Sequence, residues 1–369
     1  ENPDTAGTKL PFIIPQLRIR NARIVTVNHY KQTSFSLLVR EADLQANLSG
    51  RRLQLEGKLS GRVDSVTGKQ LVLFRREPFS AILQYAYNLK QKQGRFANTS
   101  LVLNRHQIRI TGGHRTLPQG KGANLDLKLS GNQPLFYLLT QLLPAQAKAF
   151  LSQVTTKSKM QFSLHLTGES GPTARPRSLL KFALRNGNVY LPGTKTAIRQ
   201  VTLLGEMDNG ARQQPESSRL TISEFSANTR EDSFRVALKV TNFRQPVFQF
   251  LGQGRMRLDK LAAFVKLPVN RITAGALVGK ISLSGSLPAP RLPQTPDWHG
   301  RGFLVLQEAA FRPVGLTQDC RGVNGSIRFR DNLLDMEGLQ GTLGGQPFKL
   351  QASIRNFQAY LFDQPGAIR

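Results

Sequence analysis

The sequence predicts a mainly β chain: one long, twisted, mostly antiparallel sheet folded over its apolar face, with a few short helices. A repeated pattern predicts this class, because the residues of Leu220–Phe243 correspond without a gap to those of Leu334–Phe357. Within the copies, apolar and polar residues alternate. Side chains of a strand point to opposite faces in turn, so alternation gives one apolar and one polar face. Repetition at this scale is typical of sheets whose units cannot bury their apolar faces alone.

The alternation is clearest in the second half of the first copy. Phe234, Val236 and Leu238 fall on one face of the predicted strand, whereas Arg235 and Lys239 fall on the other. Each copy is therefore predicted to be a strand, a turn and a second strand. The two copies share their anchor residues rather than the residues between them, with Leu220, Phe225, Phe234, Asn242 and Phe243 matching Leu334, Leu339, Phe348, Asn356 and Phe357.

Similar phrases divide the chain into an N-terminal lead, residues 1–16, and three groove units, residues 17–170, 171–288 and 289–369. Each unit begins with two apolar residues two apart, a turn-prone pair and an apolar residue that resumes the strand; these openings are Leu17–Ile24, Phe182–Val189 and Leu304–Phe311. Each unit ends with a strand that passes through an asparagine into an apolar cluster. Asparagine tolerates left-handed backbone, so we expect the chain to reverse there. Proline-rich stretches at 170–178 and 286–298 are predicted connectors.

Helices are expected at only two places. Pro78–Leu89 is one candidate. In Pro134–Val154, Leu135, Leu138 and Leu142 recur at helical spacing, and Pro144 is expected to split this segment into two short helices.

The composition limits the partners and the chemistry. Lys and Arg number 51 against 23 Asp and Glu, which gives a formal charge of +28. Such an excess attracts polyanions, although a basic face exposed only to water has the same composition. Cys320 is the only cysteine, so an internal disulfide or a cysteine-based metal site is excluded. No apolar run approaches the roughly 18–20 residues of a membrane-spanning helix, and because the chain begins at Glu1 we expect that an upstream signal or anchor has been removed.

Searches for catalytic patterns give only incomplete motifs. Gly275–Ile281 is one residue short of a phosphate-binding loop, and Ser178 with Lys181 lacks the other two elements of a serine acyltransferase. The histidines are not spaced as metal ligands, and His165 falls on the polar side of its strand. We therefore expect a protein that is not an enzyme, with no catalytic residue, cofactor or metal.

The amphipathic sheet carries the functional signal. If it closes into a sandwich, its apolar residues form ordinary core; if one edge stays open, they line a trough that suits lipid acyl chains. Alternation alone leaves both readings open. The candidate groove residues are the apolar-phase residues of the predicted strands: Leu17, Ile19, Leu127, Leu129, Phe162, Leu164, Phe182, Leu184, Phe234, Val236, Leu238, Ile281, Leu283, Ile327 and Phe329.

Several of these stretches resemble the AsmA family of bacterial envelope proteins, with its TamB- and YhdP-like relatives. The resemblance covers about Pro11 to Phe362, and it lies in the placement of apolar residues, Asn and Gly over segments that include 76–88, 182–205, 217–243 and 254–285. It implies a periplasmic, taco-like β groove, anchored to the inner membrane of a Gram-negative bacterium by an upstream helix. It also implies a non-enzymatic role in moving phospholipid towards the outer membrane during outer-membrane biogenesis.

The resemblance and the charge together set the expected partners. Phospholipid or another anionic lipid is the expected ligand, and the +28 charge leaves lipopolysaccharide open. Envelope proteins are further candidate partners. Nucleic acid is not expected, since the basic residues are spread over many strands and no base-reading motif accompanies them. Two alternatives remain: an envelope assembly scaffold without lipid, and a module that binds polyanions.

Overall fold

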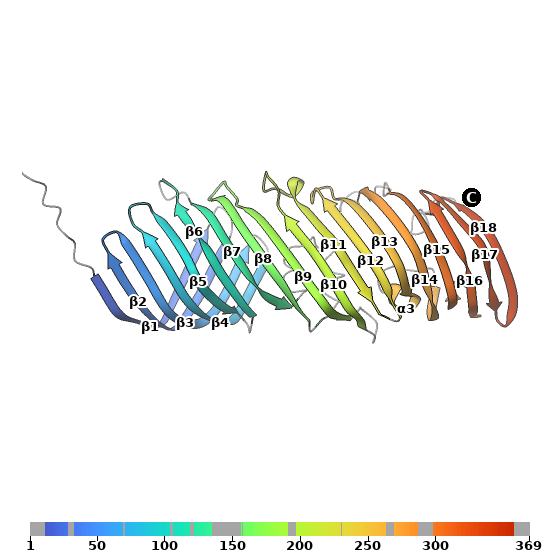
Figure 1. Ribbon diagram of the computed structural model, residues 1–369, viewed down its shortest axis with the longest axis horizontal. Coiled ribbons are helices and arrows are strands. Elements are labelled where there is room, and N and C mark those ends of the chain that lie inside the picture. Colours follow the sequence, from blue (N-terminus) through green and yellow to red (C-terminus); the bar gives the residue numbers. More distant parts are fainter. Residues whose placement is uncertain are drawn as a thin grey trace, which may run out of the picture. The chain divides into compact units, whose positions relative to one another are not determined.

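The computed structural model describes residues 12–28, 33–68, 71–103, 106–118, 122–134, 156, 158–190, 197–229, 231–262, 269–286 and 298–357. The chain divides into two compact units: unit 1 comprises residues 1–133 and 161–181, and unit 2 comprises residues 134–160 and 182–369. Nearly all the described residues are in strands, which pair antiparallel (Figure 1). The predicted fold class is therefore confirmed: mainly antiparallel β, with very few helices. The division into three groove units stays a prediction.

Unit 1 is a set of long antiparallel strands in chain order. Each strand from β1 to β6 pairs with the next one in the sequence. The strands are β1 (Phe12–Asn28), β2 (Thr33–Ser49), β3 (Arg52–Gly68), β4 (Leu71–Asn88), β5 (Gln93–Leu103), β6 (His106–Thr116) and β7 (Ala123–Pro134), followed by β8 (Lys159–Ser170). The first strand thus begins within the predicted N-terminal lead.

Unit 2 repeats this arrangement, with strands of 9 to 18 residues. Each strand from β10 to β17 pairs antiparallel with the next in the chain. The strands are β9 (Arg177–Tyr190), whose first residues belong to unit 1, β10 (Ala197–Asp208), β11 (Arg219–Asn228), β12 (Ser233–Thr241), β13 (Val247–Arg257), β14 (Val269–Ser286), β15 (Trp298–Pro313), β16 (Cys320–Arg330), β17 (Leu333–Leu343) and β18 (Gln346–Arg355).

Both copies of the repeated pattern form the predicted hairpins. The first copy forms β11 and β12, and the second forms β17 and β18. After each hairpin the expected asparagine adopts left-handed backbone, with φ of 56° at Asn242 and 60° at Asn356. Asparagine is one of the few side chains that enters this region at low cost.

The turn-prone pairs at the starts of the three predicted units (Leu17–Ile24, Phe182–Val189 and Leu304–Phe311) are irregularities inside continuous strands. The equivalent residue of each phrase has a positive φ: 54° at Asn21 in β1, 52° at Asn186 in β9 and 48° at Glu308 in β15. One such residue lets the strand continue while it shifts the alternation by one position. Consequently Leu306 and Ala309, three residues apart, both contribute to the same apolar cluster.

The predicted helix at Pro78–Leu89 is wrong. Its residues up to Asn88 belong to β4, which pairs with β3 on one side and β5 on the other. Phe79 and Leu83 fit a helical spacing, but Phe79, Ala81 and Leu83 also fit a strand, and the hydrogen bonds to two neighbouring strands favour the strand. The predicted helices of Pro134–Val154 lie outside the described residues except for Pro134, which ends β7.

Helical structure in the described residues consists of short pieces. Two of them lie wholly within the described residues: α3 (Leu258–Leu261), which directly follows β13, and one 3₁₀ turn, η2 (Pro215–Ser217). Neither these nor any other helix among the described residues has the length and apolarity that a bilayer crossing requires.

Candidate functional site

Unit 2 carries a continuous apolar face. Its central row crosses seven strands, β12 to β18, one residue from each, and the registers place each residue opposite the next. Every side chain in this row is half-buried. The row consists of Val236, Gly252, Ile281, Gly302, Phe329, Leu334 and Ile354.

Two further rows lie on either side of the central one, because residues two apart in a strand share a face. One row consists of Phe234, Gly254, Gly279, Leu304, Ile327, Met336 and Ala352. The other consists of Leu238, Phe250, Leu283 and Gly300. We call these three rows the apolar face of unit 2. Apart from Phe234, which is buried, its residues are half-buried.

Glycines in these rows lie beneath large side chains. A Cβ on Gly302 would lie 2.3 Å from the Phe329 ring, and one on Gly300 would lie 2.5 Å from a methyl group of Leu283. Glycine is therefore needed at both positions so that the ring and the leucine can lie against the sheet. The result is a smooth apolar layer rather than a set of protruding side chains.

Unit 1 has an apolar face of the same kind. One row consists of Ile19, Ala42, Leu59, Ala81, Leu101, Ile108 and Gly131, and another consists of Ile14, Ala46, Leu55, Tyr85, Phe96, Gly112 and Leu127. Tyr85 forms an aromatic cluster on this face with Phe96, whose ring centroid is 4.9 Å away, and with His114. The Tyr85 hydroxyl and His114 Nε2 are 2.9 Å apart. Burial, with a smaller effect of neighbouring Tyr87, raises the pKa of Tyr85 above its ordinary value.

The opposite face of unit 2 carries exposed basic residues, together with exposed apolar ones such as Leu251 and Phe303. Arg235, Lys280 and Arg328 lie in one cross-strand row and are exposed. In the same row, the guanidinium of Arg328 lies 5.3 Å from the ring centre of Phe303, in the geometry of a cation–π contact. The excess of positive charge thus lies on the side away from the apolar rows.

The apolar side of unit 2 is covered near one end of its strands. There α3 supplies Leu258 to a core cluster in which Ala309 is fully buried and Val323 is 2% exposed; the other members are Cys320 and Leu339. Apart from Phe234, the apolar residues of the three rows described above are only half-buried. The same side of the sheet therefore has a covered part and a part over which the described residues place no second layer.

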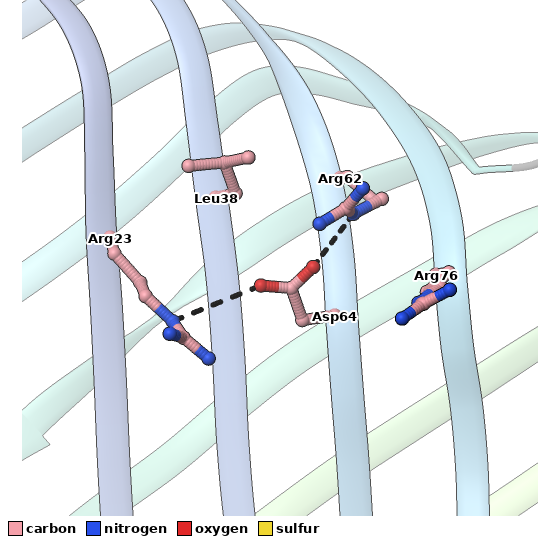
Figure 2. Close-up of a pocket in the computed structure, with 5 residues that line it drawn as sticks. All are labelled: Arg23, Leu38, Arg62, Asp64 and Arg76. Atoms are coloured by element: carbon pink, nitrogen blue, oxygen red, sulfur yellow. Dashed lines mark hydrogen bonds and ion pairs between the residues drawn. The ribbon is translucent and has the colours of Figure 1, made fainter.

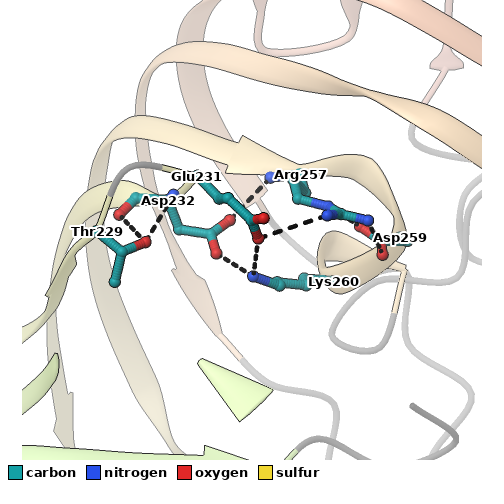
Figure 3. Close-up of polar contacts among 6 residues, drawn as sticks. All are labelled: Thr229, Glu231, Asp232, Arg257, Asp259 and Lys260. Atoms are coloured by element: carbon teal, nitrogen blue, oxygen red, sulfur yellow. Dashed lines mark hydrogen bonds and ion pairs between the residues drawn. The ribbon is translucent and has the colours of Figure 1, made fainter. Parts of the chain in front are cut away.

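A network of charged groups holds α3 in place (Figure 3). Lys260 of α3 donates to the carboxylate of Asp232, and the two side chains are 5% and 1% exposed. Asp232 also accepts a hydrogen bond from the backbone N–H of Arg257 at 3.1 Å, and its own backbone is fixed by Thr229. Glu231 lies 3.4 Å from both Lys260 and Arg257. The β11–β12 turn is thereby tied to the helix.

The end of β13 is part of this network. Arg257 binds Asp259 with two hydrogen bonds of 3.0 and 2.8 Å, and this interaction, more than any other, raises the pKa of Arg257. In the core cluster nearby, burial raises the pKa of the Cys320 thiol, and the charge of Asp319 adds to this effect. These groups stabilise the fold; they do not form a constellation that the sequence analysis associates with catalysis.

None of the fifteen candidate groove residues is exposed in the structure. Phe162, Phe182, Leu184 and Phe234 are buried, and the others are half-buried. Seven of them are brought together in the three rows of unit 2: Phe234, Val236, Leu238, Ile281, Leu283, Ile327 and Phe329. In unit 1, Leu17, Ile19, Leu127 and Leu129 are paired mainly with apolar residues or glycine, and Phe162 and Leu164 lie on β8. Phe182 and Leu184 lie on β9 in unit 2.

Two features of the structure were not predicted from the sequence. The aromatic cluster around Tyr85 lies in the segment mistaken for a helix. The Lys260–Asp232 pair carries no local signal, because its partners are separated in sequence and are brought together only when β12 and β13 pair.

Among the described residues, no group of three or more His, Cys, Asp or Glu side chains is arranged to hold a metal ion. Comparison with protein-family models, with curated proteins and with solved structures gave no match for this chain.

Proposed function

We propose that this chain is a non-enzymatic lipid conduit that shields acyl chains on its apolar faces. On this proposal it belongs to the periplasm of a Gram-negative bacterium, is anchored upstream in the inner membrane, and moves phospholipid or another anionic lipid in support of outer-membrane biogenesis. The resemblance to the AsmA family is the basis for proposing this compartment and for proposing lipid movement towards the outer membrane. The structure supports the physical part, which is a face able to hold hydrocarbon.

The observation that carries the proposal is the contrast within unit 2. In the core cluster under α3, apolar side chains are almost completely buried, whereas those of the central row are half-buried. A sandwich buries the facing side chains of both sheets at the density of a protein interior. Half-burial along a whole row is expected of a face that is covered by something other than the described chain. A contiguous apolar face of this kind marks a binding site.

The dimensions of the central row suit an acyl chain. Neighbouring strands are about 4.8 Å apart, so seven strands span roughly 29 Å. The hydrocarbon core of a bilayer is about 30 Å thick and holds two acyl chains end to end, so one chain needs about 15 Å. Each buried CH₂ contributes about 0.8 kcal/mol, and part of one chain therefore offsets much of the cost of leaving the bilayer.

The polar face supports the same role near a membrane. Exposed arginine and lysine side chains alternate with the apolar ones along β12, β14 and β16. Near an anionic leaflet each such charge adds on the order of 1 kcal/mol of attraction, and the effect decreases with salt. Head groups would remain in water while the acyl chains lie on the apolar rows.

Lipid uptake tests the proposal. The purified protein is extracted for mass spectrometry and is separately mixed with vesicles that carry fluorescent phospholipid. We expect co-purified phospholipid and saturable uptake. Ile281→Asp places a charge in the central row and should abolish uptake, whereas Ser282→Asp introduces the same charge on the other face of β14 and should leave uptake unchanged. A lipid-free preparation without uptake, or equal effects of the two variants, would overturn the proposal.

A scaffold without lipid is the second candidate, and the four buried groove residues favour it. It predicts that the apolar rows are filled by the protein itself, so that Ile281→Asp unfolds the protein instead of impairing uptake alone. A polyanion-binding module, in contrast, predicts that the logarithm of the binding constant for a polyanion falls steeply as the logarithm of the salt concentration rises. Circular dichroism of the variant and a salt titration with heparin separate these outcomes.

A further inference from the structure

Three arginines and one carboxylate of unit 1 line an open depression. Arg23 is on β1, Arg62 on β3 and Arg76 on β4, and Asp64 lies between them (Figure 2). Leu38 of β2 completes the lining. None of these residues belongs to the apolar rows described above, so whatever this depression does is separate from holding acyl chains.

Strand register explains why Arg23 and Arg62 lie on the same face. The two residues belong to one cross-strand row, with Leu38 between them. Their neighbours Val39 and Val63 are buried, so the row points to the polar side of the sheet. Strands two positions apart are about 10 Å from each other, a distance that two arginine side chains can span to meet a common ligand.

A β-bulge aims Asp64 at these arginines. Ser65 pairs with Ser36 and Val63 pairs with Leu37, which leaves Asp64 as the extra residue of β3. Bulges re-aim side chains and are common at functional sites. The Asp64 carboxylate accepts a hydrogen bond from Arg62 Nε at 2.7 Å, and its other oxygen lies 3.9 Å from Arg23 Nε.

Arg76 reaches the depression from the next strand. The register of β3 with β4 pairs Val63 with Glu77, and the next residues along, Asp64 and Arg76, therefore face each other. Arg76 adopts left-handed backbone with φ of 56°, which is costly for a residue with a long side chain and occurs mainly where the surroundings or a function require it. Arg76 and Asp64, both within the described part of the chain, line the same depression, and no salt bridge joins the two side chains.

Charge and space point to an anion. Three guanidinium groups and one carboxylate leave a net charge of +2 in the depression, whose volume is about 350 Å³ and which opens to solvent. The side chain of Arg23 is 67% exposed and that of Arg62 is 36% exposed, so both are accessible from water. Guanidinium forks match the oxygens of phosphate groups and bind them with two parallel hydrogen bonds.

We propose that Arg23, Arg62 and Arg76 form a binding site for a phosphate monoester dianion, with Asp64 holding Arg62 in place when the site is empty. Two charges on the ligand balance the net charge of the depression. The phosphate group comes either from a lipid head group or from a soluble phosphate, and the two sources share the same recognition chemistry.

Calorimetric titration with inorganic phosphate tests the site on the full chain. Replacing one binding arginine, as in Arg62→Gln, should weaken binding about 10-fold or more, since hydrogen bonds between charged groups are among the stronger ones. The matched control Arg109→Gln removes one exposed arginine from the polar face of β6 and should change the affinity by less than about 2-fold because of screening. Arg62→Lys keeps the charge but loses the fork, and should behave like Arg62→Gln.

The variant Asp64→Asn tests the role of the carboxylate in the depression. It removes the competing carboxylate, so phosphate binding should be as tight as in the unmodified protein or tighter. Weakening equal to that of Arg62→Gln would overturn the proposal, because the arginines would then depend on Asp64 as part of a structural ion network. The proposal is also overturned if phosphate does not bind, or if Arg62→Gln and Arg109→Gln weaken binding equally. Thermal melts confirm that each variant is folded.

Vesicles distinguish the two sources of phosphate. Phosphatidylcholine vesicles that contain phosphatidic acid present a monoester, and those with phosphatidylglycerol present a diester of lower charge. Arginine-dependent preference for phosphatidic acid supports a lipid head group as the ligand. Phosphate binding without vesicle binding supports a soluble phosphate. The lipid-conduit proposal fails on the uptake measured for Ile281→Asp and Ser282→Asp, whereas this proposal fails on the phosphate titration of Arg62→Gln and Arg109→Gln, so the two failures are distinguishable.

Discussion

Replacing Leu238 by Asp tests whether the apolar face of unit 2 is open. Leu238 is half-buried, between Ile222 and Phe250 in adjacent strands. Full burial of a leucine side chain contributes about 1.5–3 kcal/mol, so half of this, with up to 1 kcal/mol for poorer strand propensity, gives a loss of about 2 kcal/mol. Water reaches the new carboxylate, so no large desolvation cost is added.

The matched variant places the same carboxylate in the covered part of the sheet. Val323 is 2% exposed in the core cluster under α3. Val323→Asp loses a fully buried valine and leaves an unpaired buried charge, and the second effect alone costs about 3–5 kcal/mol. The sum is comparable to the whole stability of an ordinary domain, so we expect unfolding or loss of the unit 2 signal.

Urea unfolding followed by circular dichroism measures both variants, with Val323→Ala as a control for volume. The reasoning is refuted if Leu238→Asp is as damaging as Val323→Asp. In that case other parts of the chain cover the apolar face of unit 2, and the result favours a scaffold without lipid.

Three further predictions follow from the buried and titratable groups. Lys260→Met leaves the carboxylate of Asp232 buried without its partner and should cost about 3–5 kcal/mol, whereas Lys239→Met on the polar face should be nearly neutral in the same unfolding assay. Because burial raises the pKa of the Cys320 thiol, iodoacetamide should alkylate it slowly near pH 8 and much faster in urea; equal rates would contradict its burial. The raised pKa of Tyr85 means that the folded state holds its proton longer, so the free energy of unfolding should fall as pH rises above about 10, and Tyr85→Phe should reduce that fall; an unchanged pH profile would argue against this.

Strand patterning was predictable from the sequence because it depends on neighbouring residues. In β12 the alternation of Phe234, Val236 and Leu238 with charged residues gave both the strand and its faces, and the register confirms them. The left-handed asparagines were also predictable, since the residue type itself favours that backbone. Asn21, in contrast, was part of a predicted turn-prone pair but lies inside a continuous strand, because hydrogen bonds from β2 carry the strand through it.

What could not be predicted depends on pairing between distant segments. The β4 segment has apolar Ile82 on its outer side, 50% exposed, which obscures the alternation of Phe79, Ala81 and Leu83. The arginine depression depends on a bulge at Asp64, and no local feature of the sequence shows which residue a bulge will displace. The alternation predicted which groove residues share a face of the sheet. It could not predict how deeply each one is buried, because that depends on which part of the face α3 covers.

Site-specific photo-crosslinking in cells tests the lipid-conduit proposal most directly. A photoreactive phenylalanine is placed at Val236, Ile281 or Phe329 in the central row, and at the residue before each of them, which lies on the opposite face. Lipid adducts should form at the three apolar positions and not at positions 235, 280 and 328. Equal adduct yields on both faces, or adducts on neither, would contradict lipid binding on this face.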